Sequence, residues 1–244
     1  VFPTYENYVE QFEIFIKLIT NGGILVYNED DAEVKRIAEA ATNPIRKLAY
    51  TTPKYKVENG ITLLETPEGN MPIEVFGAHN LNNLAGAKWI CQNMGVDEAD
   101  FYEAIASFKG ASKRLEKIAE SKTKVAYKDF AHSPSKVSAT TKAVKEQYPD
   151  RTLVACLELH TYSSLNAEFL KEYQGALDAA DVAVVFYSPD AVKIKQLDEV
   201  SYEQIASSFN RNDLIIYTNP KDFRDYLFSM NLDNSALLLM SSGN

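Results

Sequence analysis

The sequence predicts an α/β fold whose second half forms a mostly parallel, doubly wound sheet. Short apolar strands alternate with helical stretches in that half, a pattern that places helices on both faces of a sheet. The strands are nearly continuous apolar runs, as expected of strands buried on both faces. We expect strands at residues 124–127, 153–157, 182–187, 214–217 and 236–240, and helices at 134–147, 167–173, 202–209 and 222–230. Ligand sites of such sheets lie beyond the carboxyl ends of the strands.

The first half predicts a separate α/β unit with shorter strands and more turns. Apolar side chains recur every three or four residues from Tyr8 to Ile19, which indicates an amphipathic helix over residues 5–20. The polar residues 28–31 are suited to cap the next helix. The other elements expected here are helices at 32–41, 79–93 and 97–108 and strands at 24–27, 47–51, 61–65 and 73–76. We place the domain boundary after Lys109, giving domains at residues 1–109 and 110–244.

The composition excludes several classes of protein. A chain of 244 residues with 45% hydrophobic content can bury a core, and a net charge of -9 argues against a nucleic-acid partner. The two cysteines suggest neither a disulfide framework nor a zinc site, so we expect a reducing, cytoplasmic location. No apolar run approaches the roughly 20 residues of a membrane span, so no membrane association is expected. The chain begins without Met and stops directly after a predicted strand, so we interpret both ends as cut.

The run from Lys128 to Pro134 is the most informative candidate site. Asp129 ends a buried strand, where a carboxylate can accept hydrogen bonds from ribose hydroxyls. His132 can donate to a phosphate or orient a substrate carboxylate. Helix-start chemistry alone explains Ser133 as N-cap and Pro134 at the first helical position. It does not explain Asp129 or His132, which are therefore candidate ligand contacts.

A second polar loop follows the next buried strand. It places His160 and the hydroxyls of Thr161, Ser163 and Ser164 beside the first loop, so it is a candidate substrate loop. A polar connection whose Ser or Thr caps the following helix explains the same residues equally well.

His79 and Asn83 form a candidate adenine site. They lie four apart at the start of a predicted helix, hence on one helical face. An Asn side chain presents a donor and an acceptor together, which matches the edge of an adenine, and His can add a polar contact or stack on the ring. Helix capping by Asn80 or Asn82 is the purely structural alternative.

Arg114 follows the expected domain boundary. Its planar guanidinium can clamp phosphate or ribose oxygens. An Arg beside a Lys at the start of a strand is more often solvated surface, and only its position between two nucleotide-like segments favours a functional role.

Taken in this order, the segments resemble the Mur ligase family. The first stretch, from Val1-Phe2-Pro3-Thr4 to Phe12, looks like the residues that follow the family's magnesium-binding His. The other matching motifs are Gly22-Gly23 to Asn28-Glu29-Asp30-Asp31, Gly77-x-His79-Asn80-x-x-Asn83, Phe108-x-Gly110-x-x-Lys113-Arg114, Asp129-Phe130-Ala131-His132-Ser133-Pro134 and Met240-Ser241-Ser242-Gly243-Asn244. Each motif alone is weak, but their order across essentially the whole chain makes the resemblance specific.

The resemblance implies a three-domain enzyme of which this chain is a C-terminal portion. Residues 1–109 would be part of a P-loop-type central ATPase domain, and residues 110–244 a Rossmann-like doubly wound C-terminal domain. The chain contains no G-x-x-x-x-G-K-[ST] phosphate loop. We therefore expect the phosphate cradle and the UDP-binding domain upstream, and no activity from this chain alone.

The resemblance also implies the reaction and the roles of the residues. The parent would phosphorylate the carboxylate of UDP-N-acetylmuramate with ATP, and an amine would attack the acyl phosphate to form an amide, with Mg²⁺ neutralising the phosphates. His79 and Asn83 would contact the adenine, Arg114 and Asp129 the ribose and phosphates, and His132, Ser133 and His160 the incoming substrate. Arg114 and His132 would be the catalytic residues.

The amine substrate is expected to be an amino acid or a peptide. The motifs Phe130-Ala131-His132 and Lys113-Arg114-Leu115-Glu116 look more like the members that attach the tripeptide L-Ala-D-Glu-diaminopimelate than like those that attach L-alanine. The loop from His160 to Asn166 departs from both, because it lacks the arginine that commonly binds the substrate carboxylate. L-alanine as substrate, and a divergent homologue without catalysis, therefore stay open.

Two rival enzyme classes share parts of this pattern. A folylpolyglutamate synthase uses the same acyl-phosphate route, but the histidine motifs fit it less well. A nicotinamide-dependent oxidoreductase also uses a doubly wound sheet, yet no Gly-x-Gly-x-x-Gly follows any predicted strand. A binding or scaffold domain is the non-enzymatic alternative.

Overall fold

A computed structural model describes residue 2, residues 4–197 and residues 200–243. Val1, Pro3 and Asn244, which belong to the two terminal motifs, lie outside the described residues. The chain divides into two compact units. Unit 1 comprises the residues up to Lys56 together with Leu63–Ile73 and Ala78–Phe108, and unit 2 comprises Val57–Thr62, Glu74–Gly77 and the residues from Lys109 onward.

Unit 1 is built on a parallel pair of strands covered by helices. β1 (Ile24–Asn28) pairs in parallel with β2 (Arg46–Tyr50), so both strands end at the same edge. α1 (Tyr5–Lys17) begins at Thr4, whose hydroxyl accepts from the Asn7 N–H at 3.1 Å. α2 (Ala32–Ala40) begins at Asp31, whose carboxylate accepts from two backbone N–H groups as the sequence predicted. The core of this part consists of Val9, Ile16, Leu25, Ile37 and Ala38.

The rest of unit 1 consists of two helices and part of a three-stranded sheet. α3 (Ala78–Asn93) and α4 (Glu98–Ala106) follow the predicted ranges closely. The sheet has the order β3-β4-β5, with β3 at Tyr55–Glu58, β4 at Ile61–Thr66 and β5 at Gly69–Ile73. Leu64 and Ile73 of the sheet pack with Leu81, Leu84 and Phe101 of the two helices.

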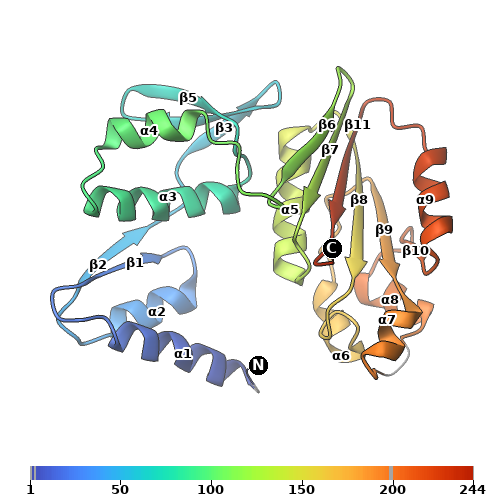
Figure 1. Cartoon of the computed structure of the whole chain (residues 1–244), viewed down its shortest axis with the longest axis horizontal. Helices are drawn as coiled ribbons and strands as arrows, with labels where there is room; N and C mark the ends of the chain where they lie inside the picture. Colours follow the sequence, from blue (N-terminus) through green and yellow to red (C-terminus); the bar gives the residue numbers. More distant parts are fainter. Residues whose placement is uncertain (1, 3, 198–199, 244) are drawn as a thin grey trace. The chain divides into compact units, whose positions relative to one another are not determined.

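Unit 2 contains the doubly wound sheet that the sequence predicted. Within the described residues the strand order is β10-β9-β8-β11-β7-β6, and only the pairing of β6 with β7 is antiparallel (Figure 1). The strands are β6 (Glu116–Glu120), β7 (Lys124–Asp129), β8 (Thr152–Leu159), β9 (Val182–Tyr187), β10 (Ile215–Tyr217) and β11 (Ser235–Met240). The last strand in sequence, β11, thus lies between β7 and β8 in the middle of the sheet.

Helices pack on both faces of this sheet. The helices are α5 (Pro134–Gln147), α6 (Ala167–Leu170) continued by a 3-10 turn at Lys171–Tyr173, α7 (Pro189–Ile194), α8 (Tyr202–Phe209) and α9 (Pro220–Ser229). Alternate residues of β8 serve the two faces: Leu153, Ala155 and Leu157 enter the larger core, with residues of α5 and α8. Val154 and Cys156 enter the core on the α9 side. The predicted α/β fold is therefore confirmed.

Some predicted elements were wrong or missing. The strand expected at residues 73–76 lies earlier, at Gly69–Ile73, because a two-residue turn after Thr66 starts the strand at once. Phe76 instead joins the core of unit 2, where its ring packs edge-on against that of Tyr127, with 5.2 Å between the ring centroids. The strands β3 and β6 and the short helix α7 were not predicted.

Candidate active site

Three neighbouring strands carry the candidate residues of unit 2 to one edge of the sheet. β11 is parallel to both β7 and β8, and its last residue, Met240, pairs with Asp129 at the end of β7. The segments that follow the three strands therefore leave the sheet at the same carboxyl edge, where such sheets bind ligands. His132 follows β7, His160 follows β8 and Ser241 follows β11.

Asp129 is a buried anchor for two turns. It is 4% exposed, its Oδ2 accepts from the Leu115 N–H at 2.7 Å, and its Oδ1 accepts from the Ala131 N–H at 2.6 Å. Hydrogen bonds from N–H groups to an ionised carboxylate are stronger than those between neutral groups. This geometry favours a positioning role for Asp129, and its contact with a ribose stays a prediction.

Arg114 stands in a turn with an uncommon backbone. Its neighbours Lys113 and Leu115 have φ values of 56° and 45°, a left-handed conformation that costs energy in residues other than glycine. The bond from the Leu115 N–H to Asp129 helps to hold this turn. Arg114 is exposed, and its Cζ lies 5.6 Å from the ring centroid of Phe130. The turn therefore holds a guanidinium beside the segment that follows β7.

His132 is fixed through both its ring and its backbone. Its Nδ1 lies 2.8 Å from the Phe130 carbonyl oxygen, and because a carbonyl only accepts, Nδ1 carries the proton. In the neutral ring Nε2 is then an acceptor. The His132 carbonyl accepts from the Tyr173 hydroxyl, and burial raises the pKa of Tyr173 above its usual range, which keeps that donor protonated. Ser133 is the N-cap of α5 as predicted, but its hydroxyl makes no capping hydrogen bond.

Glu158 and the segment after β11 form a polar cluster with His160. The Ser241 hydroxyl donates to Glu158 Oε2, and the Gly243 N–H donates to Ser241 Oγ at 2.8 Å. His160 Nδ1 lies 3.7 Å from Glu158 Oε1, which is an ion-pair distance rather than a hydrogen bond. Sequence reasoning gave Glu158 and Ser241 no role, because the pairing that makes them neighbours joins residues 83 positions apart.

The loop that follows β8 is closed by its own hydroxyl groups. Thr161 Oγ1 donates to Ser164 Oγ at 2.9 Å. The buried Ser164 hydroxyl also accepts from the Thr161 N–H and donates to the Thr161 carbonyl oxygen. Asn166 caps α6, so the predicted capping by Ser or Thr was wrong. Lys195, at the end of α7, lies 4.7 Å from the ring centroid of Tyr162. The cation beside this loop therefore comes from another element.

His79 and Asn83 lie in the first two turns of α3, in unit 1. His79 is half-buried and Asn83 is exposed. The structure confirms that one helix carries both residues, and their spacing of four places them on the same helical face. Their contact with an adenine stays a prediction.

Asn82 connects α3 to the carboxyl edge of the parallel strand pair. Its side-chain nitrogen lies 3.2 Å from Asn28 Oδ1, 3.3 Å from Asp30 Oδ2 and 3.1 Å from Thr52 Oγ1. Asn82 therefore fixes α3 against the loops after β1 and β2. Sequence reasoning considered it only as a helix cap, because these partners lie 30 to 54 residues away.

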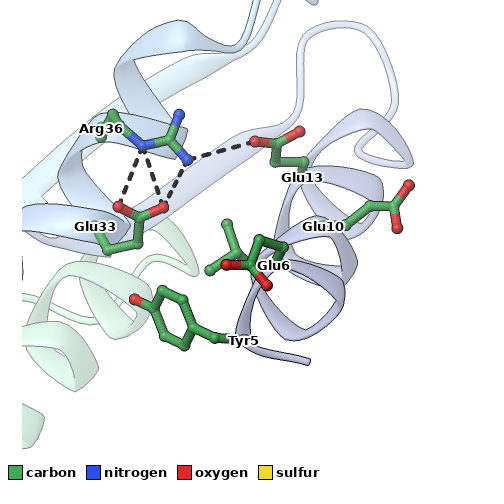
Figure 2. Close-up of a pocket in the computed structure, with 7 residues that line it drawn as sticks. Tyr5, Glu6, Glu10, Glu13, Glu33 and Arg36 are labelled. Carbon is green, nitrogen blue, oxygen red and sulfur yellow. Dashed lines mark hydrogen bonds and ion pairs between the residues drawn. The ribbon is translucent and has the colours of Figure 1, made fainter. Parts of the chain in front are cut away.

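A cavity of about 370 Å³ lies between α1 and α2 of unit 1, and none of the candidate residues lines it. Figure 2 shows its lining, in which Arg36 bonds to Glu33 and faces Glu13. The lining residues are Tyr5, Glu6, Val9, Glu10, Glu13, Glu33 and Arg36, so the cavity is acidic and its one cation is already paired.

The described residues contain no group of three or more His, Cys, Asp or Glu side chains that could hold a metal ion. In the part of the chain that the structure describes, no helix combines the length and the apolar character that crossing a membrane needs.

Comparisons with known proteins agree with the motifs. No protein-family model matches the chain. The UDP-N-acetylmuramate–L-alanine ligase of Sulfurihydrogenibium is 26% identical over 247 residues, which are 98% of this chain and 54% of that protein. The murein peptide ligase of Psychrobacter arcticus has a TM-score of 0.60 and 17% identity, with 96% of this chain and 51% of that one covered. The MurF ligase of Thermotoga maritima in complex with ADP has a TM-score of 0.70 and 18% identity, with coverage of 99% and 55%.

The structural likenesses show that the chain has the α/β fold of these two ligases. The chain is thus similar to Mur ligases both in sequence and in fold. By sequence it is similar to the UDP-N-acetylmuramate–L-alanine ligases, and it spans about half the length of the curated relatives that it matches.

Proposed function

We propose that this chain forms part of an ATP-dependent ligase that joins a peptide to UDP-N-acetylmuramate through an acyl phosphate. The observation that supports the proposal is the shared carboxyl edge of β7, β8 and β11, where the segments with His132 and His160 leave the sheet. Arg114 belongs to the turn that Asp129, the last residue of β7, holds through the Leu115 N–H. In this proposal unit 1 and unit 2 correspond to parts of the central ATPase domain and to the C-terminal domain.

The residues of unit 2 would act on the phosphate and on the amine. The substrate carboxylate attacks the γ-phosphorus of ATP and ADP leaves, and the amine nitrogen then attacks the acyl carbon as the bond to phosphate breaks. The exposed Arg114 guanidinium would bind the phosphate oxygens and neutralise their charge. His132 would orient the substrate through Nε2, because Nδ1 is held by the Phe130 carbonyl. Ser133 and His160 would contact the incoming substrate.

ATP and Mg²⁺ would be held largely by other residues. His79 and Asn83 would contact the adenine, and Asp129 would act by holding the Arg114 turn. The chain contains no phosphate loop. Bound Mg²⁺ would supply neutralising charge at the phosphates.

The tripeptide L-Ala-D-Glu-diaminopimelate is the amine that we favour. Lys195 beside Tyr162 offers a cation for a substrate carboxylate, although the loop itself has none. L-alanine is the second candidate, because the curated relatives are named for that substrate.

Amide formation by the full-length protein tests the proposal. The protein is supplied with UDP-N-acetylmuramate, ATP and Mg²⁺, with the tripeptide and L-alanine in parallel, and phosphate release and product mass are measured. We expect turnover with the tripeptide. Turnover with L-alanine alone would assign the second candidate, and no turnover with either would leave a non-catalytic homologue.

A matched pair of arginine variants tests the role of Arg114. Arg114→Ala should lower kcat by about 100-fold or more, the usual effect of removing one group that stabilises transition-state charge. Arg224→Ala is the control, because Arg224 is exposed and its guanidinium bonds to the neighbouring Asp225. Equal activity of the two variants would remove Arg114 from the mechanism.

A further inference from the structure

Glu158 is the last polar residue before β8 ends. It lies on β8 on the same face as Val154 and Cys156, which are buried, but its side chain is 29% exposed. Since β8 ends at Leu159, the Glu158 carboxylate stands at the carboxyl edge of the sheet. A ligand bound at this edge can therefore contact the Glu158 carboxylate.

The segment after β11 holds this carboxylate from one side. Ser241 donates to Oε2, and the Gly243 N–H in turn donates to the Ser241 hydroxyl. A Cβ at Gly243 would lie 3.1 Å from Glu158 Oε2 and 3.1 Å from Ser241 Oγ, so glycine gives the segment the room to approach. The orientation of Glu158 is therefore fixed before any ligand binds, which reduces the entropy that binding costs.

The second oxygen, Oε1, has no close hydrogen-bond partner among the described residues. Among the described residues, His160 is the ion-pair partner of Glu158, and its Nδ1 lies 3.7 Å from Oε1, too far for a hydrogen bond. No Lys or Arg forms an ion pair with Glu158 in the described part of the chain. A half-buried carboxylate with one oxygen held and the other facing an edge is suited to bind a cation.

We propose that Glu158 binds the ammonium group of the incoming amine, with Oε1 as the acceptor. This inference rests on the proposed function, which brings such an ammonium to this edge of the sheet. His160 borders the same carboxylate and can accept the proton that the ammonium releases before its lone pair attacks the acyl carbon. Glu158 thereby selects substrates with a free primary ammonium.

Glu158→Gln tests this role with little change in shape. The amide oxygen can still accept from Ser241, but the negative charge is lost. We expect the KM for the amine to rise by about 10-fold or more, the usual effect of losing one charge-assisted hydrogen bond. The KM values for ATP and UDP-N-acetylmuramate should not change. The control is Glu168→Gln, which removes one charge from a side chain that is 85% exposed and paired with Lys171.

Ser241→Ala separates recognition from anchoring. If Glu158 only anchors the segment after β11, then Glu158→Gln is silent and Ser241→Ala lowers kcat and raises all KM values. If Glu158 binds the ammonium, Glu158→Gln raises the KM for the amine more than Ser241→Ala does. A silent Glu158→Gln in an active enzyme would overturn the inference and leave the proposed function intact.

Calorimetric titration of the amine into full-length protein keeps the two proposals distinguishable. In one outcome the wild type binds the amine without turning it over, and Glu158→Gln weakens this binding. That result would support the inference and overturn the proposed function. Neither binding nor turnover in the wild type would overturn both. Circular dichroism of each variant checks that the fold is retained.

Discussion

Replacing Asp129 by Asn should destabilise unit 2 far more than an ordinary surface substitution. The carboxylate is 4% exposed and accepts one backbone N–H on each oxygen, from Leu115 and from Ala131. In the variant one oxygen becomes an NH₂ group, so one buried N–H faces a donor. A lost charge-assisted bond costs about 1.5–3 kcal/mol and an unsatisfied buried donor about 1–3 kcal/mol. Because relaxation recovers part of this, we expect a total cost of about 3 kcal/mol.

The assay is urea denaturation followed by circular dichroism, with the unfolding free energy extrapolated to water. Asp233→Asn is the matched control: Asp233 is 73% exposed and pairs with Lys124, so its loss should cost roughly 0–1 kcal/mol. Hydrogen exchange should also accelerate at the Leu115 and Ala131 amides. Equal unfolding free energies for the two variants would show that the Asp129 bonds do not hold the turns together.

Three further results are expected from other parts of the chain. Gly23→Ala should lower the melting temperature at a cost of about 1–3 kcal/mol, because its Cβ would lie 2.8 Å from the Thr20 carbonyl oxygen. Burial raises the pKa of the Cys156 thiol to about 12, so mass spectrometry should find it alkylated only after unfolding and after the chain's other cysteine. For Asp181, burial raises the pKa but bonds from Lys145 and a backbone N–H outweigh it and hold the pKa below its ordinary value of 3.8. Its stabilisation is present above that value and lost as the pH falls below it, so urea midpoints of Asp181→Asn should vary less with pH there.

The parts of the fold that the sequence predicted are those with strong periodic patterns. The range of α5 was predicted in full, because Pro134 marks its start and its apolar residues recur at helical spacing. β9 was likewise predicted in full as an apolar run. β6 was missed because an antiparallel edge strand with the sequence Glu-Lys-Ile-Ala-Glu has an exposed, charged pattern. Residues 189–194 form a helix too short for its periodicity to stand out.

The candidate site was only partly predictable for a similar reason. His132 and His160 could be found because each follows a recognisable strand. Glu158 became a candidate only when β11 was placed beside β8, and strand order is a long-range property that one sequence does not reveal. Asp129 was found, but its two backbone partners were not, because its bond to Leu115 spans a turn with positive φ values.

The central position of β11 has a consequence for the synthesis of the protein. β7 and β8 are translated early in unit 2, but they do not pair with each other. Each pairs with β11, which is translated some 75 residues after β8 ends. A nascent chain that lacks residues 235–240 exposes two apolar strand edges at once, which is the state that chaperones bind and that aggregates form from. Ribosome-bound chains that stop before and after this strand should therefore differ sharply in protease resistance.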